Sequence, residues 1–245
     1  MKRLVLLFVG AVLALGVFAQ ESGAKEKNAA NEAMKAKNYS EALTLLETYL
    51  KVVDYKDFPY VYNAGVVASK VKNYAAAERY FDMCITNKYK SKAAYHAKAV
   101  AQKEQKKEAE MLATLEAGMK FAPGEMKLET MYAAHFMKKG QDAQKAGNIA
   151  KAAENYQMIT NLTTKGFKVQ GLASLAGLYF NNGAKTMQAA NPIANSNKPK
   201  FEAEKAKATA DFKKAKEFLV QAQSLDAANQ DVAGLMKQVN EALSR

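Results

Sequence analysis

Apolar side chains recur at intervals of three and four residues along most of the chain, in short segments that polar turns separate. The stretch 61–81, VYNAGVVASKVKNYAAAERYF, holds two such segments joined by the polar residues KVKN. This spacing places the large side chains on one face of a helix, and strand-like alternation of β-branched residues is missing from the sequence. The pattern therefore predicts an all-α chain built from short amphipathic helices.

Three segments share one arrangement of small and large positions. They are 38–50 (NYSEALTLLETYL), 73–85 (NYAAAERYFDMCI) and 148–160 (NIAKAAENYQMIT). Each opens with Asn and then Tyr or Ile, has alanine three residues later, and has a large apolar residue four residues beyond the alanine. An alanine at a fixed place on an apolar helix face allows a neighbouring helix to come close.

Two upstream segments, VYNAGVVASKVKN and FMKKGQDAQKAGN, place a glycine four residues after a large apolar residue. A glycine inside a helix costs about 1 kcal/mol relative to alanine, so Gly65 and Gly140 indicate the close approach of a second helix. The pattern also repeats at a nearly fixed distance: Tyr39 and Tyr74 lie 35 residues apart, and Tyr74 and Glu108 lie 34 apart.

With these motifs the chain resembles the tetratricopeptide repeat (TPR) family, whose helix–turn–helix units of about 34 residues stack into a superhelix. The resemblance implies a right-handed α-solenoid of about five TPR-like helix hairpins plus a C-terminal capping helix. The implied repeats cover about 23–56, 58–91, 92–125, 133–166 and 169–228, with an insertion at 184–210 and a cap at 229–245. The implied packing positions are Tyr39, Ala42, Leu46, Gly65, Ala68, Tyr74, Ala77, Phe81, Phe136, Gly140, Ala152, Tyr156, Gly177, Phe212, Ala215 and Leu219.

The first 19 residues have the pattern of a secretory signal peptide. Lys2 and Arg3 precede an uncharged apolar run, and Val17 and Ala19 are small residues at the places that a cut after Ala19 requires. We expect export of a mature solenoid, 20–245, most naturally to the periplasm of a Gram-negative bacterium. The alternative is an uncleaved anchor and a membrane-tethered adapter, although the run is shorter than the roughly 20 residues of a membrane-spanning helix.

The chain is basic, with 36 Lys and Arg against 24 Asp and Glu, and a formal charge of +12. Beyond residue 19 the only arginines are Arg79 and Arg245. Lysine is a well-hydrated point charge typical of solvated helix faces, whereas arginine is better suited to phosphates and base edges. The composition therefore favours acidic or neutral protein partners and argues against nucleic acid.

The sequence contains no arrangement of residues that indicates catalysis or metal binding. Cys84 is the sole cysteine, which excludes an internal disulfide, and its helix-face spacing predicts a buried thiol. His96 and His135 are the only histidines and lack metal-ligand spacing. We expect a non-catalytic protein–protein interaction scaffold without cofactor, metal or catalytic residues; an enzyme of unrecognised type is the alternative from another class.

The family resemblance implies that the concave face, lined by the first helix of each pair, holds a partner segment. A carboxylate clamp formed by Asn31, Lys35 and Lys70 would be one version of such a site, and an ordinary solvated groove is the alternative. We expect an extended segment of acidic or neutral character to bind there. The candidate groove residues are Asn31, Lys35, Tyr62, Ser69, Lys70, His96, Lys103, Met137, Gln141, Gln144, Ser174 and Asn181.

The insertion at 184–210 is a second candidate surface. Pro192 and Pro199 predict a loop, and the helix-forming residues on either side predict long helices that project beyond the stack. Four of its lysines, at 198, 200, 205 and 207, make the projection basic. It is either a docking surface for a partner or a tolerated surface insertion, since a longer loop costs little free energy.

Overall fold

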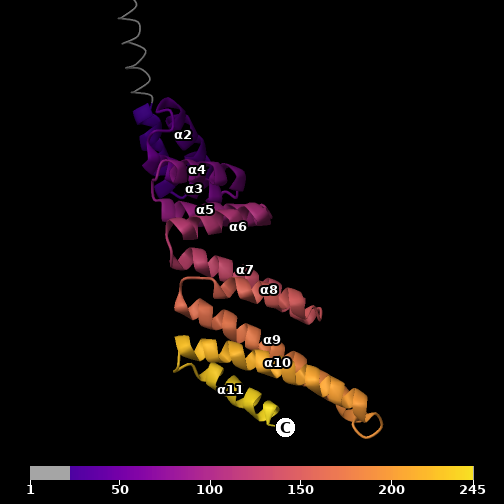
Figure 1. Cartoon of the computed structure of the whole chain (residues 1–245). Helices are drawn as coiled ribbons and strands as arrows, with labels where there is room; N and C mark the ends of the chain where they lie inside the picture. Colours follow the sequence, from indigo (N-terminus) through magenta and orange to yellow (C-terminus); the bar gives the residue numbers. More distant parts are fainter. Residues whose placement is uncertain (1–22, 245) are drawn as a thin grey trace, which may run out of the picture. The chain divides into compact units, whose positions relative to one another are not determined.

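The computed structural model describes residues 23–244, and in that range the chain forms α-helices joined by short turns, without a β-strand (Figure 1). Residues 23–35 are helical. They are followed by α2 (Tyr39–Val52), α3 (Phe58–Lys70), α4 (Tyr74–Thr86), α5 (Ser91–Glu104), α6 (Glu108–Phe121), α7 (Met126–Lys145), α8 (Ile149–Thr160), α9 (Lys165–Ala190), the 3-10 turn η1 (Asn191–Ile193), α10 (Lys198–Leu225) and α11 (Gln230–Leu243).

The predicted all-α architecture of paired helices is confirmed. The described residues divide into two compact units: unit 1 extends up to Ala122 and unit 2 starts at Pro123. In each unit consecutive helices pack as antiparallel pairs, such as α3 with α4 and α9 with α10. We call the earlier member of a pair its first helix and the later member its second helix. No helix within 23–244 has the length and apolar character needed to cross a membrane; the predicted signal peptide lies outside the described residues.

The turn between the two helices of a pair has the same backbone geometry in four pairs. Lys37, Lys72, Lys106 and Gly147 all have positive φ, at 63°, 60°, 59° and 74°. In the turn at Lys72, the N–H of Lys72 donates to Ser69 O and the N–H of Asn73 donates to Ala68 O. This Schellman arrangement pairs carbonyls that the helix end would otherwise leave unsatisfied. The left-handed residue therefore ends the first helix and reverses the chain.

The core of unit 1 is built from large side chains of second helices on small residues of first helices. Leu46, Tyr80 and Phe81 are fully buried, as are Ala64 and Ala68. The ring of Phe81 in α4 lies directly over Gly65 in α3, where an added Cβ would come within 2.8 Å of it. The close approach expected at Gly65 is present, and it is the approach of a ring to bare backbone.

Unit 2 repeats this contact in its α7–α8 pair and changes it in its α9–α10 pair. A Cβ on Gly140 in α7 would lie 2.3 Å from the ring of Tyr156 in α8. In α9, a Cβ on Gly177 would meet nothing within 4 Å, whereas one on Gly183 would lie 2.8 Å from Phe212. The sequence interpretation needs a correction here, because Gly183, and not Gly177, packs against the second helix of this pair.

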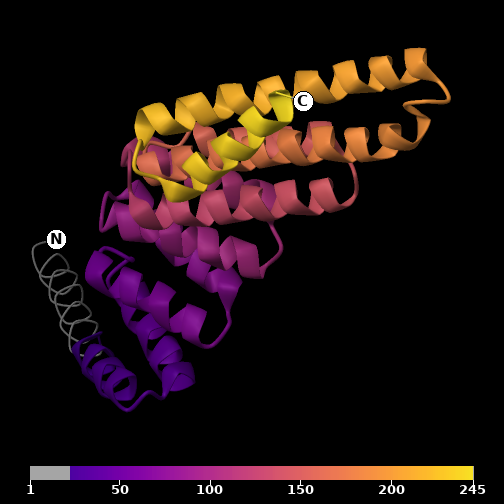
Figure 2. The same ribbon diagram turned by 90° about the horizontal axis from the view of Figure 1, so that it is seen from below.

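Helices α9 and α10 are 26 and 28 residues long and run side by side past the end of the 14-residue α11 (Figure 2). The turn between them contains Pro192, and Pro199 stands in the first turn of α10, where a missing N–H costs nothing. Asn197 caps α10 by accepting a hydrogen bond from Lys200 N. Most of the insertion 184–210 is therefore helix, and it lengthens both members of one pair.

Candidate partner-binding surfaces

In unit 1 the first helices α3 and α5 are neighbours and expose apolar side chains. Val66 of α3 is 37% exposed and Val100 of α5 is 36% exposed. His96 lies half-buried one turn before Val100, and Lys70 and Lys103 are exposed at the ends of the two helices. We call Tyr62, Val66, Lys70, His96, Val100 and Lys103 the unit 1 face.

Tyr62 on this face is held in place by other aromatic rings. Its ring packs edge-on against Phe81 and Tyr89, at centroid distances of 5.6 and 6.3 Å. The ammonium group of Lys90 lies 4.8 Å from the centre of the Tyr62 ring, a cation–π contact. Tyr62 therefore offers a partner a rigid, half-buried surface.

Three other candidates in unit 1 already have partners within the chain. Asn31 Nδ2 donates to the Tyr60 hydroxyl at 2.9 Å, and that hydroxyl donates to Asn31 Oδ1 at 3.1 Å. Lys35 forms an exposed ion pair with Glu32 at 2.7 Å, and the Ser69 hydroxyl donates to Gly65 O of its own helix. Asn31 and Lys35, which a carboxylate clamp would use, are thus engaged in local contacts.

A polar cluster that the sequence did not reveal joins residues 23–35 to the start of α3. Lys27 Nζ lies 2.9 Å from Asp57 Oδ2, and the Tyr49 hydroxyl donates to the same oxygen. The ammonium group also lies 4.3 Å from the centre of the Tyr60 ring. Burial alone would raise the pKa of Asp57, but the hydrogen bonds from Tyr49 and Lys27 outweigh it and lower the pKa.

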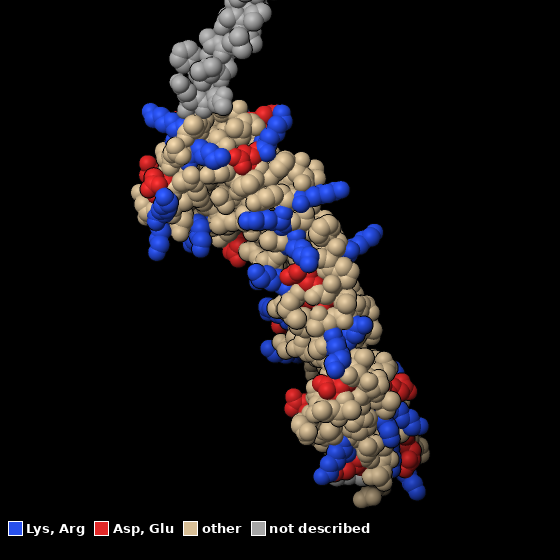
Figure 3. All heavy atoms as spheres, turned by 90° about the vertical axis from the view of Figure 1, so that its left-hand side faces the viewer, with Lys and Arg blue, Asp and Glu red and all other residues tan. Residues whose placement is uncertain are grey.

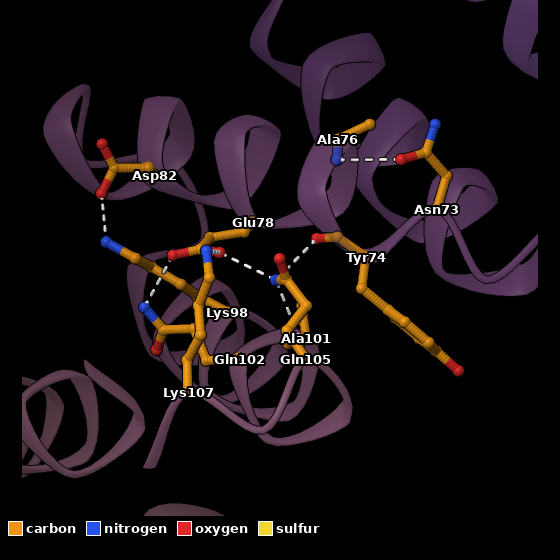
Figure 4. A network of polar contacts seen from close by, with 10 residues as sticks. All are labelled: Asn73, Tyr74, Ala76, Glu78, Asp82, Lys98, Ala101, Gln102, Gln105 and Lys107. Atoms are coloured by element: carbon orange, nitrogen blue, oxygen red, sulfur yellow. Dashed lines mark hydrogen bonds and ion pairs between the residues drawn. The ribbon is translucent and has the colours of Figure 1, made fainter. Parts of the chain in front are cut away.

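A second polar network in unit 1 joins α4 to α5 and to the turn before α6 (Figure 4). Glu78 accepts hydrogen bonds from the side chains of Gln102 and Gln105 and forms an ion pair with Lys107. The three nitrogen–oxygen distances are between 2.8 and 2.9 Å. Burial would raise the pKa of Glu78, but these donors together lower it. A carboxylate held ionised by surrounding donors cross-links helices and does not serve as a proton donor at neutral pH.

In unit 2 the candidate residues lie on the first helices α7 and α9. The Ser174 hydroxyl of α9 lies 3.7 Å from Met137 Sδ of α7, so these two candidates are in contact. Gln144 Oε1 accepts a hydrogen bond from Tyr156 at 3.0 Å, while Gln141 and Asn181 are exposed. The structure thus brings together the pair Met137 and Ser174.

Ser174 also borders a pocket of about 720 Å³ that the sequence did not predict. Met126 of α7 contributes to it, as do Phe167 and Gln170 of α9 and Leu235 of α11. Met126 is 53% exposed. The pocket lies on the first-helix side of unit 2, because α7, α9 and α11 supply its walls together with the residues that precede α9 and α11.

Beside this pocket a buried carboxylate fixes the start of α9. Glu129 of α7 is only 1% exposed and accepts hydrogen bonds from the backbone N–H groups of Thr163 and Thr164, both at 2.9 Å. Burial alone would raise the pKa of Glu129, but the hydrogen bonds from Thr164 and Thr163 outweigh it and lower the pKa. The sequence did not predict this role of Glu129, because its hydrogen-bond partners are backbone groups 34 and 35 residues away.

We next looked among residues 23–244 for side chains that could bind a metal ion or act as a nucleophile. Among residues 23–244, no group of three or more His, Cys, Asp or Glu side chains is placed to hold a metal ion. Cys84 is buried, and burial raises the pKa of its thiol to about 11. On the face drawn in Figure 3, basic and acidic side chains are interspersed.

Comparison with solved structures gives a strong match to a repeat protein. A TPR repeats protein from Bacteroides fragilis, known from its crystal structure, is 41% identical over 89% of this chain and 98% of its own, with a TM-score of 0.84. The MamA protein (15% identity, 86% and 97% coverage, TM-score 0.42) and the TPR2AB domain of yeast Sti1 in complex with pHSP90 (14%, 92% and 100%, 0.37) are more distant. No protein-family model and no curated protein matches the sequence. At this level of identity and coverage to the Bacteroides protein, the chain belongs to the tetratricopeptide repeat family.

Proposed function

We propose that this protein is a non-catalytic scaffold of the bacterial cell envelope that binds an extended segment of another protein on the unit 1 face. Membership of the TPR family points to protein–protein interaction in general. The observation that carries the specific proposal is the exposure of Val66 and Val100 on adjacent first helices, next to the exposed lysines Lys70 and Lys103.

The chemistry of this face favours a segment with apolar and acidic side chains. Val66, Val100 and the fixed ring of Tyr62 would lose water on contact with an apolar side chain, and that burial is favourable. Lys70 and Lys103 would attract a carboxylate and disfavour a basic segment. The helices are held by a packed core, so the scaffold loses little conformational freedom on binding.

Photocrosslinking in the native host, followed by mass spectrometry, tests this site. We expect Val66→Glu and Val100→Glu to abolish the crosslinks that a protein with a photoreactive residue at position 62, and no other change, forms. Val52→Glu is the matched control, because Val52 is 40% exposed on the second helix α2. If Lys70→Glu, Lys103→Glu and both valine variants retained every partner, the unit 1 face would not be the binding site.

Export is a separate part of the proposal and has its own test. The basic start, the apolar run and the small residues before Gln20 support cleavage after Ala19. Sequencing the N-terminus of the protein recovered from the periplasmic fraction should give Gln20 as the first residue. A retained Met1 in the membrane fraction would favour the membrane-tethered adapter instead.

A further inference from the structure

The paired helices α9 and α10 extend past the helix that covers them. Helix α11 lies against both and buries Val232 and Val239 in a cluster with Ala176, Ala215 and Leu219. It ends at Leu243, while α9 and α10 continue to their own turn (Figure 2). We call the part of α9 and α10 from 184 to 210 the arm.

A cavity of about 610 Å³ lies beside the end of α11, at the base of the arm. Phe180 and Met187 of α9, Phe201 and Phe212 of α10, and Leu243 of α11 give it apolar walls. All of these except Phe212 are only partly buried. We call this cavity the arm groove.

The arm groove continues a surface that already receives a helix. Val232 and Val239 show how α11 docks on α9 and α10, and the groove begins where Leu243 ends that contact. Ala184 lines the groove and is exposed, so it offers a small residue at which a helix backbone can approach. The occupant that this surface fits is another helix, lying with its apolar side on the arm.

The charge of the arm specifies the rest of the partner. Residues 184–210 contain five lysines and two glutamates. Lys198 and Lys200 are exposed at its tip, and Lys185 is exposed nearer its base. We propose that the arm groove docks an amphipathic helix of another protein, with an apolar stripe toward Met187 and Phe201 and acidic side chains toward the arm lysines. This site is distinct from the unit 1 face, and either can fail without the other.

Two synthetic helical peptides can test the proposal by fluorescence anisotropy with the full mature chain. Both carry the same leucine stripe at helical spacing; the remaining positions are mainly glutamate in one and mainly lysine in the other. We expect the acidic peptide to bind. Met187→Glu or Phe201→Glu should weaken it by about tenfold or more, as when an interface anchor is lost. Val220→Glu, at a residue of α10 that is 52% exposed and outside the groove, is the matched control and should leave binding unchanged.

Charge reversal separates the roles of the apolar walls and the lysines. The triple variant of Lys185, Lys198 and Lys200 to Glu should weaken the acidic peptide and strengthen the basic one. The proposal is overturned if neither peptide binds up to about 1 mM, if both bind the unmodified protein equally, or if Val220→Glu matches Met187→Glu. Dimers in sedimentation experiments that Met187→Glu abolishes would also overturn it, since the occupant would then be a second copy. Far-UV circular dichroism confirms that each variant is folded.

Discussion

The α3–α4 and α9–α10 pairs make the same kind of contact at different sequence distances. Gly65 meets Phe81 16 residues later, as Gly140 meets Tyr156, whereas Gly183 meets Phe212 29 residues later. In both pairs a ring lies on a glycine backbone, although the helices of the second pair are about twice as long. The contact therefore depends on a small and a large residue meeting across the pair, and not on a fixed repeat length.

In both pairs a carboxylate fixes the start of the first helix, but the groups that donate to the carboxylate differ. Asp57, before α3, is held by an ammonium group and a phenol. Glu129, which fixes the start of α9, is held by two backbone N–H groups. The donors of the first arrangement are side chains that single substitutions remove, whereas those of the second are main-chain groups that every residue except proline retains.

The largest expected effect is the loss of the buried ring in the regular pair. Phe81→Ala should destabilise unit 1 by about 3–5 kcal/mol, because it leaves a cavity in a fully packed core. Phe212→Ala should cost less, because Phe212 borders the arm groove and water can enter the space. Urea unfolding measures both. Phe121→Ala is the control, since that ring is 53% exposed; equal losses at 81 and 212 would make the two contacts equivalent.

Glu129→Gln should destabilise unit 2 by about 1–3 kcal/mol at neutral pH, because a charged acceptor of two buried N–H groups is lost. The folded pKa of Glu129 lies below its ordinary value of 4.5. Its stabilisation is therefore complete above that value and is lost as the pH falls through the folded pKa.

The pH dependence of unfolding is the measurement that isolates this residue. The Glu129→Gln variant should lose part of the decline in stability on acidification that the unmodified protein shows. Glu154→Gln, which removes an exposed pair with Lys151, is the control and should change stability by no more than about 0.5 kcal/mol. Parallel acid profiles for Glu129→Gln and the unmodified protein would contradict the assignment.

Alanine at the glycines of unit 2 tests the corrected contact in the long pair. Gly140→Ala and Gly183→Ala should each cost about 1–2 kcal/mol, because the new methyl group would lie within 3 Å of a ring. Gly177→Ala should instead stabilise by about 0.5–1 kcal/mol, since the added group meets nothing and alanine favours helix. A loss at 177 as large as that at 183 would restore the original interpretation. Thermal melting decides between them.

The smallest expected effect comes from exchanging residues between the turns of the two units. Lys72 has φ of 60° and Gly147 has φ of 74° at matching places. Lys72→Gly should stabilise by about 0.5–1 kcal/mol, and Gly147→Lys should destabilise by a similar amount, because only glycine adopts this conformation without strain. Chemical denaturation of both single variants measures the difference, and changes of the same sign would rule out this explanation.

The sequence predicted the helices and their pairing well, because both depend on local spacing. Ala77, Phe81 and Gly65 are periodic, and their burial follows from helix geometry. The contacts that escaped prediction link residues far apart in sequence. Glu129 and Lys27 look like solvated surface charges until the next helices are in place, and Gly183 could not be chosen over Gly177 without the length of both helices. The binding role of the unit 1 face remains a prediction.

The short α11 has a consequence for how this molecule can change over time. At a rise of 1.5 Å per residue, the arm's part of α9 (184–190) is about 10 Å long and its part of α10 (198–210) about 20 Å, and α11 ends at the base of both. Substitutions in the arm beyond the end of α11 change a surface that few other parts of unit 2 contact. The tip can therefore diverge to suit new ligands, while the ring-on-glycine contacts nearer the base keep the protein folded.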